Sequence, residues 1–583
     1  MSTPTRTVAI IGIGPRGSFA LESYINELSE RKLLTAIHIL LFDAQGKFGY
    51  GPVYELTQND ADWLNISERI LLLEARPTIQ YKNITIPSFP SYHEWTGKDF
   101  TSKSKDAVDH YPKRSKLGLY LQERLQSLIL PLQQEKLVRL ISSKVEKVEK
   151  NNHQLFIQCE DGNNYKNVDE VLLTIGHQPT KTSTQLADWK KFINNNKNLK
   201  LYTAPYPLSA FLNDNLDYNA SIGIRGFGLA MIDVMRGIAT ELGQLKLSDT
   251  QTRKYNYSTT QDLKNLIIPF SLDGLPAVPK PLNATIDDWF KPNENEIKSF
   301  EDQIGDPQVQ KEAKDFDFLI EAFAPIAATL FLNLPQAYTS KTYAKKELTE
   351  TIKLWLKDSK HTHPSLVDNN TNTYKLMQEF VGMATMKQAI SLDYCIGQVW
   401  RHCQPSIYDK LSFNNCSDEA IASIIELDER VKRYSFGPPV DSIQQIIALV
   451  DAEVLNLDWV NNPKIELSNT GWELKNNQST IMVKTMINSV IDSPVIKAVN
   501  SPLVKHLLAN DVLKAVHDDL GIETDDNGYI LVDEKSEVFI AVLGRLAKGT
   551  IIGVDAILEC FGKRPQAWAA KATDHHERFL KNQ

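Results

Sequence analysis

Three glycines close to the start of the chain have the spacing of a phosphate-binding turn. Gly12, Gly14 and Gly17 follow an apolar run, and Pro15 and Arg16 stand between the last two. The first glycine permits a tight turn, the second lets backbone approach a pyrophosphate, and the third lets helix and strand pack closely. The helix N–H groups that follow then face the phosphates. This pattern predicts a dinucleotide site, with Arg16 either on the phosphates or on the surface.

The segments around this turn have the patterns needed to position it. Residues 5–14 are rich in β-branched side chains and too short for a buried helix, which predicts a buried parallel strand. Residues 18–33 have apolar side chains at helical spacing, and residues 37–44 form a second apolar run. Together they predict a right-handed βαβ unit. Asp43 ends its second strand, where a carboxylate can reach a ribose hydroxyl pair.

A long loop rich in glycine and aromatic residues follows, over residues 46–67. Beside a nucleotide site, such a loop is more plausible as the wall around a flat ring than as a simple connection. Asn65 lies near its end. Its amide could point at that ring or cap the turn.

A second glycine pair lies about two hundred residues later. Residues 220–244 again have the pattern of strand, glycine turn and helix, and residues 267–276 supply the next strand. The turn contains Gly226 and Gly228, but the third glycine slot holds Met231. We therefore expect a second dinucleotide fold, either a working nicotinamide site or a vestigial one.

Composition excludes several classes of protein. A chain of 583 residues is too long for one core. The formal net charge of −8 gives no basic excess that would indicate nucleic acid. No apolar run has the length of a membrane span, which predicts a cytoplasmic protein without a membrane partner. No cysteine pair has CxxC spacing, which argues against a disulfide framework, a zinc site and a dithiol redox centre and favours buried free thiols. The five cysteines are Cys159, Cys395, Cys403, Cys416 and Cys560.

Residues 286–460 differ in character from the segments before them. Helical patterns dominate there, with charged stretches between them. We expect a helical insertion or cap that supplies substrate selectivity. Within it, residues 433–442 contain Gly-Pro-Pro, which predicts a rigid loop.

Several short motifs together resemble a flavoprotein family usually described as FAD/NAD(P)-binding proteins. These proteins are relatives of the flavoenzymes with two dinucleotide domains, which include N-hydroxylating amino-acid monooxygenases. The resemblance covers most of residues 1–285 and returns near the C-terminus. The motifs are GIGPRG at 12–17, FGYGPVY at 48–54, WLNIS at 63–67, YPKRSKLGLYLQERL at 111–125 and LLTIGHQP at 172–179.

The resemblance implies that the first glycine motif holds the FAD pyrophosphate. It also implies that the stretch ending in Gly176 marks the crossing between two dinucleotide domains. His177 follows and is more plausible as a loop packing residue than as a catalytic one. Near the C-terminus, Gly544 would contact flavin, while Arg545 and Lys548 could meet anionic flavin or substrate.

The second cofactor implied by the resemblance is NADPH or NADH. In relatives that use NADPH, an arginine often follows a serine at the end of the strand over 267–276 and holds the 2′-phosphate. Here Ser271 is followed by Leu272. This departure weakens the case for NADPH and leaves open NADH or no nicotinamide at all.

The predicted fold class is α/β, with two Rossmann-like dinucleotide-binding domains and a large helical insertion. The expected boundaries are 1–200 for the first part of the FAD-binding domain, 201–285 for the NAD(P)-binding-like domain, 286–460 for the helical insertion, and 461–583 for a return to the FAD-binding domain.

Three enzyme chemistries fit two adjoining dinucleotide domains. A disulfide reductase needs a redox-active cysteine pair, which the sequence lacks. We favour an FAD-dependent NAD(P)H monooxygenase acting on a small polar substrate, because it needs no acid–base triad and an enclosing helical segment suits it. Amino-acid or amine N-hydroxylation is the favoured subtype by family analogy alone. The alternatives are an NAD(P)H:acceptor reductase or oxidase, and a non-catalytic flavin-binding protein.

Overall fold

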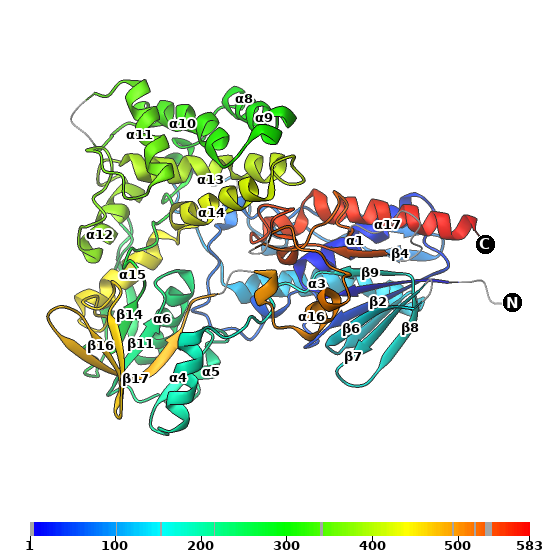
Figure 1. The fold of residues 1–583 in the computed structure, drawn as a ribbon, viewed down its shortest axis with the longest axis horizontal. Helices are drawn as coiled ribbons and strands as arrows, with labels where there is room; N and C mark the ends of the chain where they lie inside the picture. Colours follow the sequence, from blue (N-terminus) through cyan, green and yellow to red (C-terminus); the bar gives the residue numbers. More distant parts are fainter. Residues whose placement is uncertain are drawn as a thin grey trace.

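The computed structural model consists of two sheet-containing halves and a group of helices (Figure 1). The first sheet lies on one side of the molecule, the second on the other, and the helices of the middle of the chain lie beside the second. The structure describes residues 5–100, 102–151, 154–214, 216–338, 342–491, 495–517, 520–530 and 539–582.

The first sheet has five parallel strands in the order β18-β9-β1-β2-β5. Their apolar runs are buried on both faces, which is typical of parallel sheets. Helix α1 (Pro15–Glu30) connects β1 to β2, as the βαβ pattern predicts. The strands are β1 (Arg6–Ile11), β2 (Ile37–Asp43), β5 (Val138–Ser142), β9 (Glu170–Leu173) and β18 (Phe539–Val542).

Each face of this sheet has its own core. Helices α1, α3 and α17 cover one face, and α17 runs beside α1 (Figure 1). A small antiparallel sheet and helix α16 cover the other face. These elements are α3 (Arg114–Gln134), α17 (Lys563–Lys581), α16 (Pro502–Ala509), β6 (Val145–Asn151), β7 (Gln154–Cys159) and β8 (Asn164–Val168).

A buried carboxylate fastens the C-terminal helix to the first sheet. Glu170 is fully buried and pairs with Arg6 of β1. It also accepts hydrogen bonds from Tyr529 Oη at 2.6 Å and Trp568 Nε1 at 3.2 Å, and His575 Nδ1 lies 3.1 Å away. These partners hold the pKa of Glu170 at about 2 although burial alone would raise it.

The second sheet has the order β14-β11-β17-β16-β15, and β10 pairs with β17. Strands β10, β11, β14 and β17 are parallel, and β15 and β16 add an antiparallel hairpin. Helix α6 (Leu229–Leu242) follows β11. The strands are β10 (Lys200–Tyr202), β11 (Ser221–Arg225), β14 (Ile267–Phe270), β15 (Lys464–Ser468), β16 (Gly471–Lys475) and β17 (Thr480–Asn488).

This pairing corrects the expectation that residues 461–583 return as a whole to the first domain. Strand β17 pairs with β11, with Ile222 opposite Thr485, so the second sheet is completed by residues 464–488. The chain rejoins the first sheet at β18. The apolar pattern of residues 528–534 also predicts a strand, and this segment lies partly outside the described residues.

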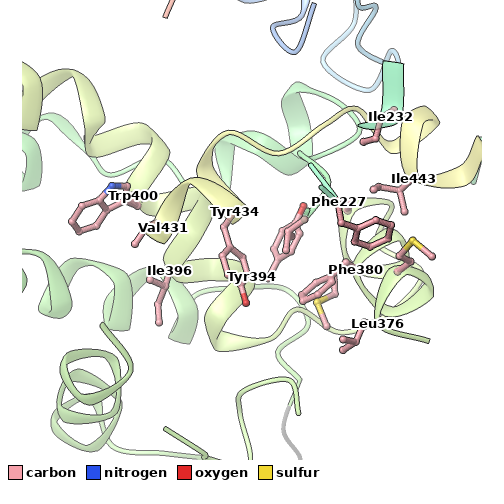
Figure 2. Packing of buried hydrophobic residues seen from close by; sticks show 14 of the residues in the cluster. Phe227, Ile232, Leu376, Phe380, Tyr394, Ile396, Trp400, Val431, Tyr434 and Ile443 are labelled. Atoms are coloured by element: carbon pink, nitrogen blue, oxygen red, sulfur yellow. The ribbon is translucent and has the colours of Figure 1, made fainter. Parts of the chain in front are cut away.

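The helical segment shares one hydrophobic core with the second sheet. Phe227 and Ile232, which follow β11, pack in the same cluster as Phe380, Trp400 and Tyr434 of the helices (Figure 2). The predicted α/β fold with two parallel-stranded halves and a large helical segment is confirmed. The helices are α7 (Ala284–Asp288), α8 (Glu294–Ile304), α9 (Pro307–Glu312), α10 (Asp317–Leu332), α11 (Lys345–Lys357), α12 (Thr373–Ala384), α13 (Leu392–Lys410), α14 (Asp418–Ser435) and α15 (Val440–Asp451).

Short elements complete the described chain. They are η1 (Pro52–Tyr54), η2 (Glu68–Ile70), β3 (Ile79–Tyr81), β4 (Ile84–Ile86), α2 (Tyr92–Thr96), α4 (Thr184–Asn194), α5 (Ser209–Leu212), β12 (Gln244–Asp249), β13 (Lys254–Ser258), η3 (Ile496–Ala498), η4 (Arg545–Ala547) and η5 (Leu558–Phe561). Among the described residues, no helix combines the length and apolar character needed to cross a bilayer.

Candidate active site

The first glycine turn is tight on one side and open on the other. Gly12 has a φ of +96°, and a Cβ on Gly17 would lie 2.3 Å from the Gly12 carbonyl oxygen. Gly14 is the N-cap of α1 and has nothing within 4 Å of an ideal Cβ. Because neither Gly14 nor Pro15 supplies a side-chain cap, the first amide groups of α1 are left for another acceptor.

A cavity of about 240 Å³ opens in front of this turn. Helix α1, the ends of β2 and β9, the glycine-rich loop and the C-terminal segment all line it. Gly17 does not line it but lies behind the turn. The predicted residues that the cavity brings together are Gly12, Gly14, Pro15, Arg16, Asp43, Gly176 and Gly544.

Arg16 links the first turn to the C-terminal segment. Its guanidinium is buried and donates to the Glu559 carbonyl at 2.8 Å and to the Val554 carbonyl at 3.4 Å. Gly544 has a φ of +93°, and an ideal Cβ there would lie 2.8 Å from Arg16 Nε. The sequence left two positions open for Arg16, on the phosphates or on the surface. Because the guanidinium is buried, the structure excludes the surface position.

Asp43 shapes the loop that leaves β2. Its Oδ1 accepts the backbone N–H groups of Gln45 at 3.0 Å and Lys47 at 2.8 Å. The side chain is buried at the cavity wall. The loop conformation and the carboxylate position are thus fixed together.

His177 is held in its neutral form at the cavity. Arg545 Nη1 lies 2.6 Å from His177 Nε2 and 3.0 Å from Asp555 Oδ1. Partial desolvation of the ring and the Arg545 guanidinium lower the pKa of His177 to about 4, although the residue remains solvent-exposed. At neutral pH the ring therefore has no proton to donate from Nε2 to a ligand, which favours the packing role over the catalytic one.

The C-terminal segment is also tied to the helical segment by ion pairs. Burial opposes ionisation of Asp555, but Lys432 of α14 at 3.0 Å and Arg545 outweigh it and hold the Asp555 pKa well below its usual range. Lys548 is buried and pairs with Glu429 of the same helix. The structure thus places Lys548 against α14, and Lys548 is not among the described lining residues of the first cavity.

A second cavity, of about 180 Å³, adjoins the first. It lies between the glycine-rich loop, helix α6 and the Gly-Pro-Pro loop, and it shares Val53, Tyr54 and Asp555 with the first cavity. The predicted residue Asn65 is here and not in the first cavity. The other lining residues are Trp63, Leu64, Arg114, Leu229, Ile232, Asp233, Arg236, Pro438, Pro439 and Ser442.

A buried ion-pair network joins the walls of the second cavity. Asp233 of α6 accepts from Arg114 Nη2 at 2.8 Å and Tyr206 Oη at 2.7 Å on one oxygen, and from Arg236 Nη1 at 3.1 Å on the other. The Arg236 guanidinium also lies 4.1 Å from the Trp63 ring centroid. These contacts hold the glycine-rich loop against helix α6.

Asp62 beside this network was missed by sequence reasoning. It is 1% exposed, and neither carboxylate oxygen has a hydrogen-bond partner among the described residues. Burial and the nearby Asp233 raise the Asp62 pKa to about 7, against the opposing effect of Arg114 and Arg236. The only available signal was an acid next to a tryptophan in a loop, because its burial depends on α6, far away in sequence.

The second glycine turn brings together the other three predicted residues. The Gly226 amide donates to the Phe270 carbonyl at 2.8 Å, so the ends of β11 and β14 lie side by side. Gly228 is the N-cap of α6, with open space at its Cβ position. Ser271 Oγ accepts the Gly274 amide at 2.9 Å. Gly226, Gly228 and Ser271 line neither cavity among its described residues.

The cysteines are single thiols. Cys159, Cys395 and Cys403 are buried, and Cys416 and Cys560 are half-buried. Cys560 lines the first cavity, and burial raises its thiol pKa. Within the described parts of the chain, no group of three His, Cys, Asp or Glu side chains is placed to hold a metal ion.

Residues 9–178 match the model of a family described as FAD-NAD(P)-binding. This segment is similar to an FAD-NAD(P)-binding domain. The domain contains the first glycine turn, Asp43, Asn65 and Gly176. A search of curated proteins finds no match to the chain.

Similar solved structures include three enzymes. Ornithine hydroxylase from Pseudomonas aeruginosa is 12% identical, with 98% of this chain and 100% of that chain covered and a TM-score of 0.42. L-lysine 6-monooxygenase from Pseudomonas syringae is 12% identical, with 98% of this chain and 99% of that chain covered and a TM-score of 0.44. Ornithine N-hydroxylase from Kutzneria sp. 744 is 11% identical, with 99% of this chain and 100% of that chain covered and a TM-score of 0.42.

Proposed function

We propose that this chain is an FAD-dependent NAD(P)H monooxygenase acting on a small polar substrate, with N-hydroxylation of an amine or amino acid as the favoured reaction. One observation carries the proposal. The cavity of the FAD-NAD(P)-binding domain adjoins a second cavity that is walled by helix α6, which follows the second glycine turn, and by the helical segment. A cofactor and a substrate therefore have separate but touching compartments.

The first cavity fits FAD. Open space at Gly14 and the uncapped start of α1 suit a pyrophosphate, and Asp43 at the end of β2 suits a ribose. Arg16 and Gly544 close the cavity from the C-terminal side. The nicotinamide dinucleotide would use the second turn, where Gly228 is equally open and Ser271 ends the neighbouring strand.

Bound FAD supplies hydride acceptance from NAD(P)H and, once reduced, reaction with O₂. The overall reaction balances as NAD(P)H, H⁺, O₂ and an amine giving NAD(P)⁺, water and a hydroxylamine. The chain's own part is to bind, orient and exclude water. Val53 and Tyr54 separate the two cavities, while Pro438 and Pro439 close the second from the helical side.

The positions of the cysteines support direct transfer of reducing equivalents from the flavin to oxygen or to a diffusible acceptor. The first cavity has one cysteine, Cys560, among its described lining residues. A dithiol relay needs two adjacent thiols. Reducing equivalents would therefore leave the flavin without a protein disulfide as carrier.

The test is incorporation of labelled O₂. Purified yellow protein, NAD(P)H and a panel of amines and amino acids should give one product that contains one labelled oxygen atom. NAD(P)H consumption that yields only hydrogen peroxide with every compound would favour the reductase or oxidase. No consumption of either nicotinamide by flavin-loaded protein would favour a non-catalytic flavin-binding protein.

A further inference from the structure

One residue outside the lining of the second cavity contacts two of its walls. Lys280 lies between β14 and α7, where the chain leaves the second sheet for the helical segment. Its backbone N–H donates to the Pro438 carbonyl at 3.0 Å. Its Nζ donates to the Asn65 carbonyl. Asn65 and Pro438 both line the second cavity, one from the FAD-NAD(P)-binding domain and one from the Gly-Pro-Pro loop.

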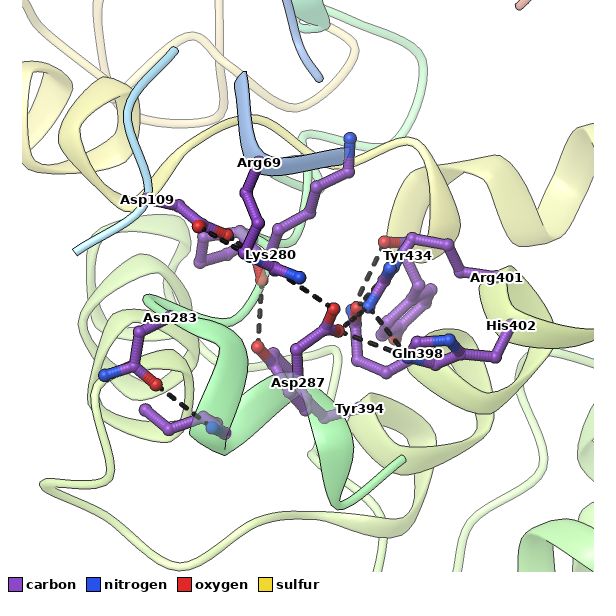
Figure 3. A network of polar contacts seen from close by, with 12 residues as sticks. Arg69, Asp109, Lys280, Asn283, Asp287, Tyr394, Gln398, Arg401, His402 and Tyr434 are labelled. Carbon is purple, nitrogen blue, oxygen red and sulfur yellow. Dashed lines mark hydrogen bonds and ion pairs between the residues drawn. The ribbon is translucent and has the colours of Figure 1, made fainter. Parts of the chain in front are cut away.

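A network of ion pairs between three parts of the chain lies beside Lys280 (Figure 3). Arg69 and Asp109 of the first domain form a two-bond ion pair at 2.9 and 2.8 Å. Asp287 of α7 contacts Arg69 at 3.4 Å and also pairs with Arg401 of α13. The network therefore fixes the segment that bears Lys280 to both neighbours.

We propose that Lys280 is a positioning residue that sets the separation between the Asn65 wall and the Pro438 wall of the second cavity. The Lys280 Nζ donates to the Asn65 carbonyl and its backbone N–H to the Pro438 carbonyl, so one residue spans the two walls. The identity of the cavity as a substrate site rests on the proposed function. The connection that Lys280 makes between the two walls does not depend on the proposed function.

The charge on Lys280 is sensitive to pH near neutrality. Burial and the Arg401 guanidinium lower its pKa to about 7, while Asp287 and Asp109 act in the opposite direction. Because the folded-state pKa is lowered, the ammonium loses its proton as pH rises through about 7. The free-energy cost of burying a charged Nζ disappears with that proton, so opening of the Asn65 loop should become less favourable above about pH 7. The other titratable or charged groups near this network are Arg69, Tyr111, Tyr394 and His402.

Hydrogen–deuterium exchange tests this directly on the flavin-loaded protein. Peptides that cover residues 60–70 and 434–442 report the two walls, and a peptide from α17 is the internal reference. Lys280→Met keeps much of the aliphatic stem but removes the donor. We expect exchange in the 60–70 peptide to rise about tenfold, the factor for loss of one hydrogen bond of about 1.4 kcal/mol, while the 434–442 peptide, held by the Lys280 backbone N–H, and the reference peptide stay unchanged.

The arginine variant supplies the decisive control. Wild-type exchange in the 60–70 peptide, corrected for the intrinsic rate, should be faster at about pH 6 than at about pH 8, because opening hydrates a Lys280 ammonium that is costly to bury. Lys280→Arg should remove that difference, because a guanidinium keeps its charge. Lys264→Met, at an exposed lysine paired with Glu453, should behave as wild type. If Lys280→Met does not fold, the arginine variant alone still decides.

Kinetics separate this inference from the proposed function. Lys280→Met should raise the KM for the amine with little change in kcat and no change in flavin content. Equal exchange of the 60–70 peptide in wild type and Lys280→Met, or an unchanged pH difference in Lys280→Arg, would overturn the positioning role even if the enzyme is active. Failure of NAD(P)H to reduce the wild-type flavin would overturn the proposed function and leave the exchange result valid.

Discussion

The two glycine turns of this protein begin with the same contact and then differ. The Gly12 amide donates to the Phe42 carbonyl at 2.8 Å, and the Gly226 amide donates to the Phe270 carbonyl at 2.8 Å. This shared register makes Asp43 and Ser271 equivalent positions. The first turn therefore has a carboxylate at this position, where the proposed function expects a ribose, whereas the second has a neutral hydroxyl.

The residue at the third glycine position is a further difference between the two turns. A Cβ on Gly17 would meet the Gly12 carbonyl oxygen at 2.3 Å, so α1 starts in close contact with its strand. Met231 at the same position of the second turn is 1% exposed and packs in the core shared with the helical segment. The first turn is built for close approach, and the second turn combines a nucleotide-binding fold with anchoring of the helices.

The largest expected effect is at Gly17. In Gly17→Ala the new methyl group meets backbone, which cannot move aside as a side chain can, and we expect a loss of about 3 kcal/mol in stability. Thermal unfolding of the flavin-free proteins measures it. Gly228→Ala is the matched control, because its Cβ would have open space. Equal shifts in the two variants would contradict the difference between the turns.

The next effect concerns flavin binding. Gly14→Val adds a Cβ with no atom within 4 Å and places a side chain where the proposed pyrophosphate would approach. We expect flavin affinity to fall at least a hundredfold, about 2.7 kcal/mol, as measured by fluorescence titration of the apoprotein. Gly228→Val should keep flavin and weaken nicotinamide binding instead. Full flavin occupancy in Gly14→Val would show that the pyrophosphate lies elsewhere.

A third effect concerns nicotinamide choice. Leu272 is 87% exposed and directly follows Ser271, so it has space for a longer side chain. Leu272→Arg should shift preference toward NADPH, since a charge-assisted contact with the 2′-phosphate contributes about 1.5–3 kcal/mol. The ratio of kcat/KM for NADPH and NADH measures the shift, and Ala44→Arg at the equivalent position of the first turn should leave it unchanged. A wild-type preference for NADPH above about a hundredfold would show that other residues bind the phosphate.

The smallest expected effect is a pH dependence at His177. Its pKa is lowered from 6.5 to about 4 in the folded protein, so the unfolded chain takes up a proton that the folded chain does not. Stability should therefore decline as pH falls from 6.5 toward 4, and His177→Asn should show a smaller decline in thermal unfolding. The effect is small because the imidazole is solvent-exposed. An identical acid profile in wild type and variant would place the pKa of His177 near its ordinary value.

The local sequence pattern was sufficient to predict the first glycine turn. It was insufficient to predict the contacts between domains. Glycine spacing and strand periodicity predicted both βαβ units, because these signals are short in sequence. The position of residues 464–488 was not predictable in this way, since a strand that joins either sheet has the same apolar alternation. Asp62 and Lys280 were likewise missed, because their surroundings are made by segments far apart in the chain.

The central claim is that the two turns bind cofactors that react with each other. Anaerobic titration of the purified yellow protein with NADH and then NADPH tests it most directly. We predict stoichiometric bleaching of the flavin by at least one nicotinamide in wild type, and none at the same concentration in Gly228→Val, which keeps its flavin. A bound flavin that neither nicotinamide reduces, or a Gly228→Val variant that is reduced as well as wild type, would contradict the account.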